Sequence, residues 1–533
     1  MSSINSIQTF DYIVVGGGSA GCTVAGRLAE ANVGRVLLLE AGGKAESNPE
    51  TLSADGFKYT FANDALMIDR MSEPQSTCGN RTVYSGSGRG MGGSGSVNGM
   101  VYTRGDKLDY AQWPAGWHWE DVETAFQQLE QRLRVRHRTG TKFTEIALDA
   151  AEAAGFKRKN RLNDGNLSGF MGYNDMNFEA DNRRSSYVAF IAENDSTNLT
   201  VKTKCQVHKI LFDERLTAVG VEVEIDGRKQ NFMARKEVIL SAGALETPKL
   251  LMLSGIGPKA HLESLGIPVL KDVASIGSNL QDHLNVTMFF RGRQPVDFGY
   301  PQLYGFYRCN KGLDLPALQA DTCFAWISLA GILPGIIKRS APATVLRGKQ
   351  FFNPFLNALV RHTLTLLVSL PGVKRFINNL YGIAVILGKP VSRGTLRLAS
   401  RNAKDPALVD LAYFQDSADM ETILKGVELT NKIAAHSGLQ AWGNQAVQSA
   451  ALSNNRPVLE KWARSSAVTT FHYCGTCSMG EDVDSPVDTQ LRLKGFSNIR
   501  IADASVFPVV PVSALNAPSM MVGFRAADFI LTK

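Results

Sequence analysis

A glycine-rich turn near the N-terminus has the residue types and spacing that bind a dinucleotide. Gly16-Gly-Gly18-Ser-Ala-Gly21 directly follows the apolar run FDYIVV at 10–15, and Glu40 stands nineteen residues after Gly21. Gly16 permits a tight turn, Gly18 lets the backbone approach a pyrophosphate, and Gly21 lets a helix pack on a strand. Glu40 can accept hydrogen bonds from ribose hydroxyls. The pattern predicts a nucleotide site, to which we also assign the adjacent Ser19, Ala20 and Ala41.

The segments around this turn predict the elements that position it. Residues 10–15 and 35–39 (RVLLL) are apolar runs typical of buried strands, and 22–30 (CTVAGRLAE) is typical of a helix with small residues facing a sheet. Strand, helix and strand in this order form the first unit of a Rossmann-like α/β domain, in which the helix N-terminus favours a bound phosphate. The motif by itself does not separate FAD from NAD.

A second glycine-rich loop, at 88–98, could lie against a cofactor. It has five glycines in eleven residues, so its backbone amides could approach a pyrophosphate or the edge of a flavin ring where side chains would clash. An ordinary turn would explain the glycines, but not the Asn98-Gly-Met-Val101 that continues the loop.

Motifs along the whole chain resemble the glucose-methanol-choline (GMC) oxidoreductases, in particular their alcohol and choline dehydrogenase branch. Residues 88–102 resemble the first signature of the family, 241–257 resemble its second, and 471–480 (FHYCGTCSMG) resemble the stretch that holds its active-site histidine. Asn279-Leu-Gln-Asp-His283 and 499–508 (IRIADASVFP) match as well. The resemblance implies bound FAD, oxidation of an alcohol, and the GMC fold, in which a Rossmann-like FAD-binding domain joins a discontinuous α+β substrate-binding domain.

The resemblance also implies which further residues contact FAD. The first signature supplies the flavin side, the second signature and the C-terminal motifs supply the rest, and one strand residue meets the adenine through its backbone. In that order these residues are Gly90, Gly93, Ser94, Asn98, Gly99, Met100 and Val101, then Ala242, Gly243, Asp503, Ala504, Asn516 and Pro518, and lastly Val207. An alternative role for Asp503 is to cap a turn or helix.

His472 is the candidate for the chemistry. Oxidation of an alcohol by flavin requires loss of the hydroxyl proton, transfer of a hydride to flavin N5, and stabilisation of the negative charge on the reduced ring. By resemblance His472 is the general base, or the hydrogen-bond partner of the developing alkoxide. The alternative for any histidine seen alone is a satisfied core residue. His283, although it lies in a motif, is interpreted as packing or orienting a loop.

The position that normally carries a second catalytic group departs from the family pattern. Many relatives have Asn-x-Asn-Ala-Pro, where this chain has Ala514-Leu-Asn516-Ala-Pro518. The side chain of Ala514 can neither donate nor accept a hydrogen bond. A missing bond of about 1–3 kcal/mol would cost roughly ten- to a hundred-fold in rate. Asn516 is the other candidate for a catalytic role through a local shift, although its spacing to Pro518 argues against this.

Three functions therefore remain open. The first is an alcohol dehydrogenase or oxidase with an unusual active site. The second is a GMC-like flavoprotein with altered chemistry, of the lyase or fatty-acid photodecarboxylase type, against which His472 argues mildly. The third is a non-catalytic FAD-binding protein.

The domains are expected to be discontinuous, because the segments that resemble the FAD scaffold alternate with segments that do not. The FAD-binding domain is predicted at 1–159, 188–284 and 470–533, and the substrate-binding domain at 160–187 and 285–469. Apolar periodicity predicts helices at 119–133, 143–154 and 420–436.

Charge is distributed unevenly in this chain of 533 residues, whose net charge is +7 and whose composition, 44% hydrophobic and 20% charged, is that of a globular protein. Residues 322–404 contain twelve Lys or Arg and no Asp or Glu, together with apolar clusters at 323–337, 364–370 and 381–387. Each cluster is too short to span a bilayer. Two interpretations remain open: a surface that lies on anionic lipid, or a substrate domain whose apolar runs are core. No motif in it indicates nucleic acid.

The remaining features bear on substrate and location. A hydrophobic alcohol, aliphatic, aromatic or terpenoid, suits the apolar stretch better than a sugar or choline, and the electron acceptor is expected to be a quinone or O2. The seven scattered cysteines predict a reduced cytoplasmic protein. If the stretch 322–404 lies on lipid, we expect the protein to contact the inner face of the membrane. Cys474-Gly-Thr-Cys477 has no second pair, so no metal site is expected. Residues 1–10 show no secretory signal.

Overall fold

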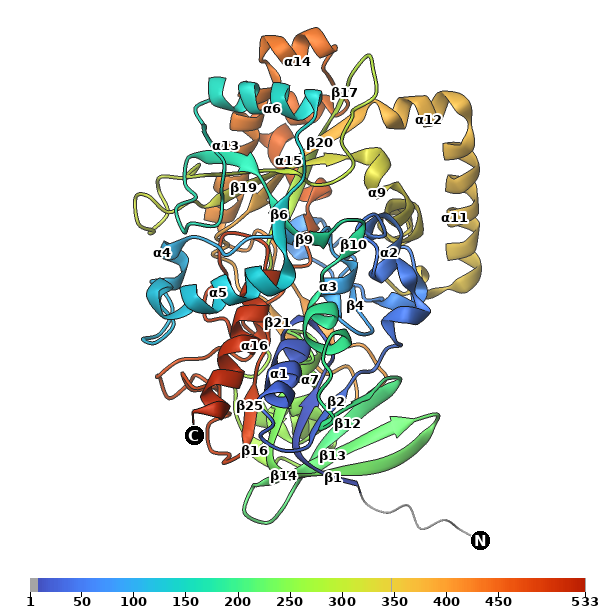
Figure 1. The fold of residues 1–533 in the computed structure, drawn as a ribbon. Helices are drawn as coiled ribbons and strands as arrows, with labels where there is room; N and C mark the ends of the chain where they lie inside the picture. Colours follow the sequence, from blue (N-terminus) through green and yellow to red (C-terminus); the bar gives the residue numbers. More distant parts are fainter. Residues whose placement is uncertain (1–7, 347, 533) are drawn as a thin grey trace.

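Two sheets organise the protein in the computed structural model, which describes residues 8–346 and 348–532 (Figure 1). Residues 1–7 lie outside the described residues, and they make up most of the stretch 1–10 that shows no secretory signal. Arg347, one of the twelve basic residues of 322–404, also lies outside them. Within them, one sheet has seven strands and is built around β1, and the other has eight strands and is built around β20. In Figure 1 the first sheet lies in the lower half of the molecule and the second in the upper half.

The first sheet contains the predicted Rossmann-like unit. Its strands run β11-β2-β1-β14-β13-β12, with β25 paired to β14. Pairing is parallel between β11, β2, β1, β14 and β25, whereas β12, β13 and β14 form an antiparallel extension. The strands are β1 (Gln8–Val15), β2 (Val36–Leu39), β11 (Leu199–Lys202), β12 (Cys205–Phe212), β13 (Ala218–Ile225), β14 (Arg228–Leu240) and β25 (Ile499–Ile501).

Local sequence accounts for this unit. All four residues of β2 and the last four of β1 are buried, as expected of a parallel strand covered on both faces. Helix α1 (Ser19–Glu30) buries Ala20 to Gly26 almost completely, and its small side chains let α16 (Asn516–Leu531) pack against it. The predicted strands and helix therefore form, with α1 beginning three residues earlier than its apolar pattern.

The second sheet is antiparallel except for one edge. Its strands run β23-β17-β20-β19-β18-β8-β7, with β24 paired to β17, and only β7 and β8 are parallel. The strands are β7 (Lys157–Lys159), β8 (Phe170–Tyr173), β17 (Leu284–Arg291), β18 (Leu303–Tyr307), β19 (Thr322–Ser328), β20 (Leu380–Leu387), β23 (Gln445–Ala446) and β24 (Val468–Thr469). Except for β7, these strands lie in the predicted substrate-binding segments 160–187 and 285–469, or begin within one residue of those segments.

Helices cover this sheet and extend from it. Helix α13 (Ser417–Ala434) packs on β17, β19 and β20. Helices α6 (Lys142–Ala153) and α15 (Arg456–Ser466) pack against α13, and α14 (Ser437–Trp442) packs against α6. The predicted helix at 119–133 is α5 (Trp119–Leu133), and those at 143–154 and 420–436 are α6 and α13 with slightly shifted ends. A series of helices continues from β19: α9 (Leu329–Gly335), η6 (Ile336–Ser340), α10 (Ala341–Val345), η7 (Gly348–Phe352), α11 (Pro354–Ser369) and α12 (Pro371–Asn378).

Small elements complete the chain. A third sheet joins β5 (Val101–Tyr102), β6 (Val135–His137), β9 (Asp175–Glu179) and β10 (Asn182–Arg183). Three strand pairs are β3 (Met67–Ile68) with β4 (Ser87–Gly88), β15 (Ile256–Gly257) with β16 (Lys271–Asp272), and β21 (Thr395–Arg397) with β22 (Leu408–Asp410). The remaining α-helices are α2 (Phe57–Thr60), α3 (Ser94–Val97), α4 (Lys107–Tyr110), α7 (Glu246–Leu253) and α8 (Lys259–Ser264).

The acid-free stretch divides between the two interpretations given above. Strand β20 is buried at all eight positions and β19 at six of seven, so the apolar runs at 323–328 and 381–387 belong to the core. Helix α11, which contains all of the apolar cluster 364–370 except its last residue, buries only Asn357 among its sixteen residues. Part of the stretch is therefore core, and part is an exposed apolar surface.

Candidate active site

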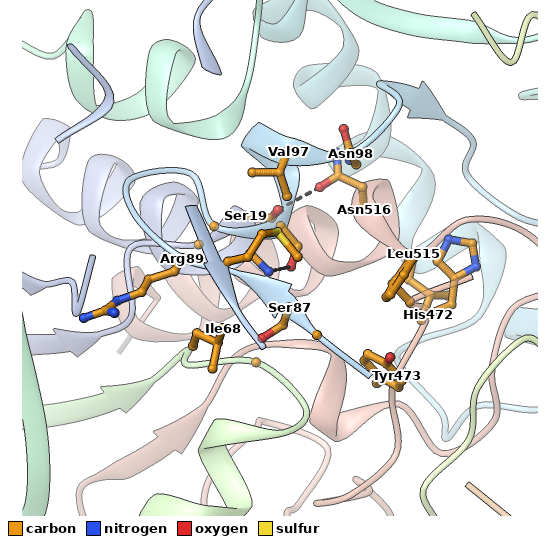
Figure 2. Close-up of a pocket in the computed structure, with 18 of the residues that line it drawn as sticks. Ser19, Ile68, Ser87, Arg89, Val97, Asn98, His472, Tyr473, Leu515 and Asn516 are labelled. Atoms are coloured by element: carbon orange, nitrogen blue, oxygen red, sulfur yellow. Dashed lines mark hydrogen bonds between the residues drawn. The ribbon is translucent and has the colours of Figure 1, made fainter. Parts of the chain in front are cut away.

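A cavity of about 620 Å³ is walled by residues of both main sheets. Val15 and Leu39 contribute from β1 and β2, and Thr287, Ala325 and Ile386 contribute from β17, β19 and β20. His472 and the two glycine-rich loops also line it. Figure 2 shows this arrangement, with Ser19, Asn98 and Asn516 on one side and His472, Tyr473 and Leu515 on another. The cavity therefore joins the predicted nucleotide site to the predicted base.

The N-terminal turn leaves room for a phosphate. Gly16 has φ +104°, and a Cβ atom there would meet the Ser241 carbonyl oxygen at 2.4 Å. A Cβ atom on Gly21 would meet the Gly16 oxygen at 1.9 Å, so both glycines are required by close backbone packing. Gly18 also lines the cavity, but a Cβ atom there would meet no protein atom within 4 Å. This open space lies at the start of α1, where a pyrophosphate would be stabilised by the helix N-terminus.

Glu40 links three backbone loops as well as facing the cavity. Its Oε2 accepts from the N–H of Gly17 at 2.9 Å, and its Oε1 accepts from Gly42 at 2.7 Å and Gly90 at 2.9 Å. Burial raises the pKa of this carboxyl, and the three amide hydrogen bonds oppose that shift. A carboxylate offers about four acceptor positions, so one remains for a ribose hydroxyl.

Asp503 combines the two roles considered for it. Its Oδ1 accepts from the Ser505 N–H at 2.8 Å and caps the short 3₁₀ helix at 504–506. Its Oδ2 accepts from the Gly243 N–H at 2.9 Å and from the Thr247 hydroxyl at 2.6 Å. Asp503 also lines the cavity, so capping does not remove it from the nucleotide side.

Most of the predicted cofactor residues line this one cavity. They are Gly16, Gly18, Ser19, Ala20, Glu40, Ala41, Gly93, Ser94, Asn98, Gly99, Val101, Val207, Ala242, Gly243, Asp503, Ala504 and Asn516. Four others do not line it. Gly21 packs on Gly16, Gly90 holds Glu40, Met100 packs with Ala54 and Met176, and Pro518 is buried in the first turn of α16. These four support the wall, and their assignment as direct FAD contacts stays a prediction.

His472 is held in one tautomer by a chain of hydrogen bonds. His283 Nε2 lies 3.0 Å from the Gly388 carbonyl oxygen, which can only accept, so this nitrogen carries the proton. Burial lowers the pKa of His283 well below its ordinary value, and the nearby His472 and Lys389 lower it further. Neutral His283 therefore has an acceptor at Nδ1, and His472 Nδ1, 3.0 Å away, donates to it.

This leaves His472 Nε2 free to accept a proton. Within residues 8–346 and 348–532, no protein group hydrogen-bonds to this nitrogen, and His472 lines the cavity. Burial lowers the pKa of His472 to about 4, so the imidazole is neutral at pH 7. A neutral, correctly protonated imidazole facing a cavity is what a general base requires.

The segment 279–283 also holds the backbone around His472 in place. Gln281 and Cys474 exchange two backbone hydrogen bonds of 3.0 Å. The His472 N–H donates to Asp282 Oδ1 at 3.0 Å, and the Thr470 hydroxyl donates to the His283 carbonyl at 2.6 Å. The motif that resembled the family at 279–283 therefore positions the candidate base. The sequence predicted only that His283 packs or orients a loop and assigned no role to Asp282, so the contact of His283 with His472 Nδ1 was not predicted.

Asn516 and Ala514 occupy different parts of the cavity. Asn516 Oδ1 accepts from the Ser19 hydroxyl at 2.7 Å, on the nucleotide turn, as the dashed line in Figure 2 shows. Leu515, not Asn516, lies beside His472 there. Ala514 is 8% exposed and packs with Val101 and Tyr304. This geometry favours a cofactor role for Asn516, and its predicted catalytic role has no supporting contact.

Charged side chains of the cavity wall are already engaged by other protein groups. Glu246 bonds to Arg70 and lies 3.4 Å from Lys249, and Glu40 and Asp503 hold backbone and hydroxyl groups. Around Ala514 the wall is apolar, formed by Val101, Tyr304, Ala325, Ala384 and Ile386. Arg89 and Lys58 also line the cavity, and neither was predicted from the sequence.

Both cysteines of the Cys-x-x-Cys segment are buried and free. Burial raises the pKa of each thiol, which disfavours the reactive thiolate. No group of metal-binding side chains occurs among the described residues.

Comparison with known proteins decides the family. Residues 10–285 match the N-terminal part of GMC oxidoreductase, and residues 390–523 match its C-terminal part. The chain belongs to the GMC oxidoreductases. This GMC oxidoreductase is an FAD-dependent enzyme that acts on alcohols, which sets aside the alternative of a non-catalytic FAD-binding protein.

Relatives and solved structures cover almost the whole of this GMC oxidoreductase. It is 31% identical to an oxygen-dependent choline dehydrogenase of Photobacterium profundum, over 98% of this chain and 93% of the relative. It is 32% identical to an alcohol dehydrogenase [acceptor] of Pseudomonas putida, over 98% and 96%. A crystal structure of pyridoxine 4-oxidase from Mesorbium loti is similar with a TM-score of 0.83 and 26% identity, over 97% and 98%. These likenesses confirm the predicted fold and cofactor.

The residues around the turn and the glycine loop fit FAD in this GMC oxidoreductase. The open space at Gly18 and the remaining acceptor position of Glu40 suit a pyrophosphate and a ribose. The loop at 88–99 and Val207 extend the same wall.

Proposed function

We propose that the enzyme oxidises a hydrophobic alcohol, aliphatic, aromatic or terpenoid, to the aldehyde or ketone, with His472 as the base. The observation that carries the proposal is that His472, whose Nε2 bonds to no described group, lines a cavity whose wall around Ala514 is apolar. When bound, FAD supplies the acceptor for the hydride that leaves the alcohol carbon.

His472 removes the hydroxyl proton in this proposal. Its Nε2 accepts the proton, and the resulting imidazolium keeps its Nδ1–H bond to His283, so the ring does not have to turn. The Asp282 carboxylate accepts a hydrogen bond from the backbone N–H of His472. In this proposal that bond fixes the position of the imidazole relative to the substrate. Ala514 contributes no second hydrogen bond, so the proposal assigns substrate orientation mainly to the shape of the apolar wall.

The charge pattern supports an uncharged substrate. Glu40, Glu246 and Asp503 line the cavity, but each is engaged by the contacts described above. A quaternary ammonium substrate would be favoured by a free carboxylate beside the aromatic rings, and none stands among the described lining residues. The similarity to choline dehydrogenases therefore concerns the reaction class, and we propose a different substrate.

The electron acceptor and location extend the same proposal. A quinone is the acceptor that suits an apolar substrate taken from lipid, with O2 as the alternative. The enzyme would then work in the cytoplasm, at the inner face of the membrane.

Anaerobic titration of the oxidised enzyme tests the proposal. Primary alcohols of increasing chain length, and choline at the same concentrations, would be added in the dark while flavin absorbance is recorded. Faster bleaching with longer alcohols is the expected result. Bleaching by choline alone would contradict the hydrophobic substrate.

Altered chemistry is the second candidate, because Ala514 does line the cavity where the family usually has a hydrogen-bonding residue. If no alcohol bleaches the flavin, a fatty acid under blue light is the next addition. Loss of carbon dioxide from the fatty acid would then favour the photodecarboxylase type over alcohol oxidation.

A further inference from the structure

An exposed apolar elbow stands beside the cavity wall. Helices α11 and α12 meet at 85°, and in Figure 1 they form an L at the right-hand edge of the molecule. Among the described residues no single helix is long and apolar enough to cross a bilayer, although this bent pair has the composition when its two helices are taken together. We define the elbow as residues 345–376 without 347.

Large apolar side chains are concentrated on the elbow. Of the twenty such side chains exposed in the described chain, eight lie here: Val345, Phe352, Phe355, Leu359, Leu366, Leu367, Leu370 and Phe376. Phe355 is 75% exposed. Phe355, Leu359 and Leu366 recur at helical spacing and so share one face of α11, and Leu370 follows at the end of that helix. Monomeric proteins rarely expose a patch of this kind unless something covers it.

Charge beside the elbow indicates what covers it. A surface cavity of about 340 Å³ is lined by Arg291, Arg293 and Arg375 together with uncharged residues. No hydrogen bond or ion pair links these three guanidinium groups to other described residues, and Arg291 lies over the ring of Phe376, 5.1 Å from its centre. Since residues 322–404 contain no Asp or Glu, nothing on the elbow opposes an anionic surface.

Apolar contacts connect the elbow to the base. Leu356 and Val360, on the inner face of α11, pack against a cluster that contains Tyr84 and Phe351. Tyr84 lies 6.1 Å from Phe471, ring centre to ring centre, and Phe471 precedes His472 and lines the cavity. Helix α12 also packs on α9, whose Ile332 lines the same cavity. The elbow is therefore joined to the wall of the active-site cavity.

We propose that the elbow inserts into one leaflet of an anionic phospholipid bilayer, with the three-arginine cavity on the lipid phosphates, so that the alcohol reaches the cavity from the lipid. An interfacial helix pair buries its apolar face at the acyl boundary while adjacent cations hold the headgroups. The access route rests on the proposed function, whereas docking on lipid does not.

Sedimentation with vesicles tests the docking. The FAD-loaded enzyme is mixed with vesicles of phosphatidylcholine alone or of phosphatidylcholine with phosphatidylglycerol, at low and high salt. It should sediment with the anionic vesicles at low salt and be partly released at high salt. Equally poor binding to both compositions would overturn the proposal.

Variants locate the contact. Leu366→Asp with Leu370→Asp should abolish vesicle binding, whereas Leu318→Asp, at a site that is 79% exposed elsewhere, should leave it unchanged. Arg291→Glu with Arg375→Glu should weaken binding to anionic vesicles at least about ten-fold, whereas Lys209→Glu should not. Unchanged binding in both double variants would overturn the assignment to the elbow. All positions are exposed, and retained flavin absorbance would show that each variant is folded.

Two further readouts separate the alternatives. If the Asp double variant converts a dimer to a monomer in sedimentation equilibrium, and no vesicle binds the enzyme, the elbow contacts a second copy instead of lipid. Elbow variants should keep their turnover of a short, water-soluble alcohol and lose turnover of a long-chain alcohol supplied in vesicles. If no alcohol is oxidised at all, the proposed function fails, and docking is judged from sedimentation alone.

Discussion

The Nδ1 atoms of His472 and His283 lie 3.0 Å apart, although 189 positions separate the two residues in the chain. Because the Gly388 carbonyl oxygen accepts a hydrogen bond from Nε2–H of His283, the Nδ1 of His283 is an acceptor, and the proton between the two rings belongs to His472. The same bond thus orients the candidate base and leaves its Nε2 lone pair for substrate. Each of the first three predictions below follows from this contact.

Replacement of His472 by Ala should remove the base and leave the cofactor site intact. General-base catalysis contributes about 10²–10⁴-fold in rate, so flavin bleaching by alcohol should slow by that factor. The visible spectrum before substrate should be unchanged, because the residues assigned to the nucleotide lie elsewhere on the wall. Stopped-flow absorbance measures both. A variant that bleaches at the normal rate would contradict the assignment.

His283→Leu should lower activity without removing a group that touches substrate. The leucine cannot accept the Nδ1–H bond, so only the Thr470 hydroxyl, 3.1 Å from His472 Nδ1, remains to orient this N–H, and the imidazolium is less stabilised. We expect kcat to fall at least about ten-fold, as for loss of a hydrogen bond to a charged group, with little change in KM. His283→Asn keeps an acceptor oxygen and should recover part of the loss. Equal loss in both variants would indicate a packing role only.

The pH dependence should reflect the low pKa of His472, which is about 4. The base is active when deprotonated, so kcat/KM should be constant near neutral pH, and the fall caused by protonation of His472 should appear only below about pH 5. Protonation of Asp282 should add a separate limb near pH 6, since burial raises its pKa to about 6 and its carboxylate holds the His472 N–H. In Asp282→Asn the limb due to His472 should remain. A limb near pH 7 in the unmodified enzyme would contradict an imidazole that is neutral throughout this range.

Ala514→Asn should restore the missing hydrogen-bonding group. Short alcohols should gain roughly ten-fold in kcat/KM from one added bond in the transition state. Bulky alcohols should lose activity, because the larger side chain enters the space beside Val101 and Tyr304. Steady-state kinetics with two alcohols of different size give both values. No change with either alcohol would show that Ala514 is remote from the reacting hydroxyl.

Glu40→Gln should weaken FAD binding. The carboxylate accepts three backbone N–H groups, whereas the amide of glutamine has only one oxygen and would point its NH₂ at a backbone donor. Each unsatisfied buried donor costs about 1–3 kcal/mol, so the Kd for FAD should rise ten-fold or more. Glu120→Gln, an exposed acid on α5, is the matched control. Flavin fluorescence on release measures the Kd, and an equal Kd in both variants would contradict the role of Glu40.

Local sequence determined the nucleotide-binding unit. The strand at β1, the turn at Gly16 and the helix α1 are contiguous, so hydrophobic pattern and glycine spacing within thirty-three residues, from 8 to 40, were sufficient to predict them. The same holds for α5, whose apolar periodicity matched its observed ends. The motifs at 279–283 and 471–480 also identified the family from sequence.

Tertiary structure decided what those motifs do. Ser19 and Asn516 are 497 positions apart and share a hydrogen bond, which favours a cofactor role for Asn516 over a catalytic one. The similar apolar runs at 364–370 and 381–387 have opposite surroundings, one exposed on α11 and the other buried in β20. An apolar run shows that a segment can be buried, but only the packing of other elements against it determines whether it is covered. The tautomer of His472 likewise depends on the Gly388 carbonyl, a contact that no local pattern contains.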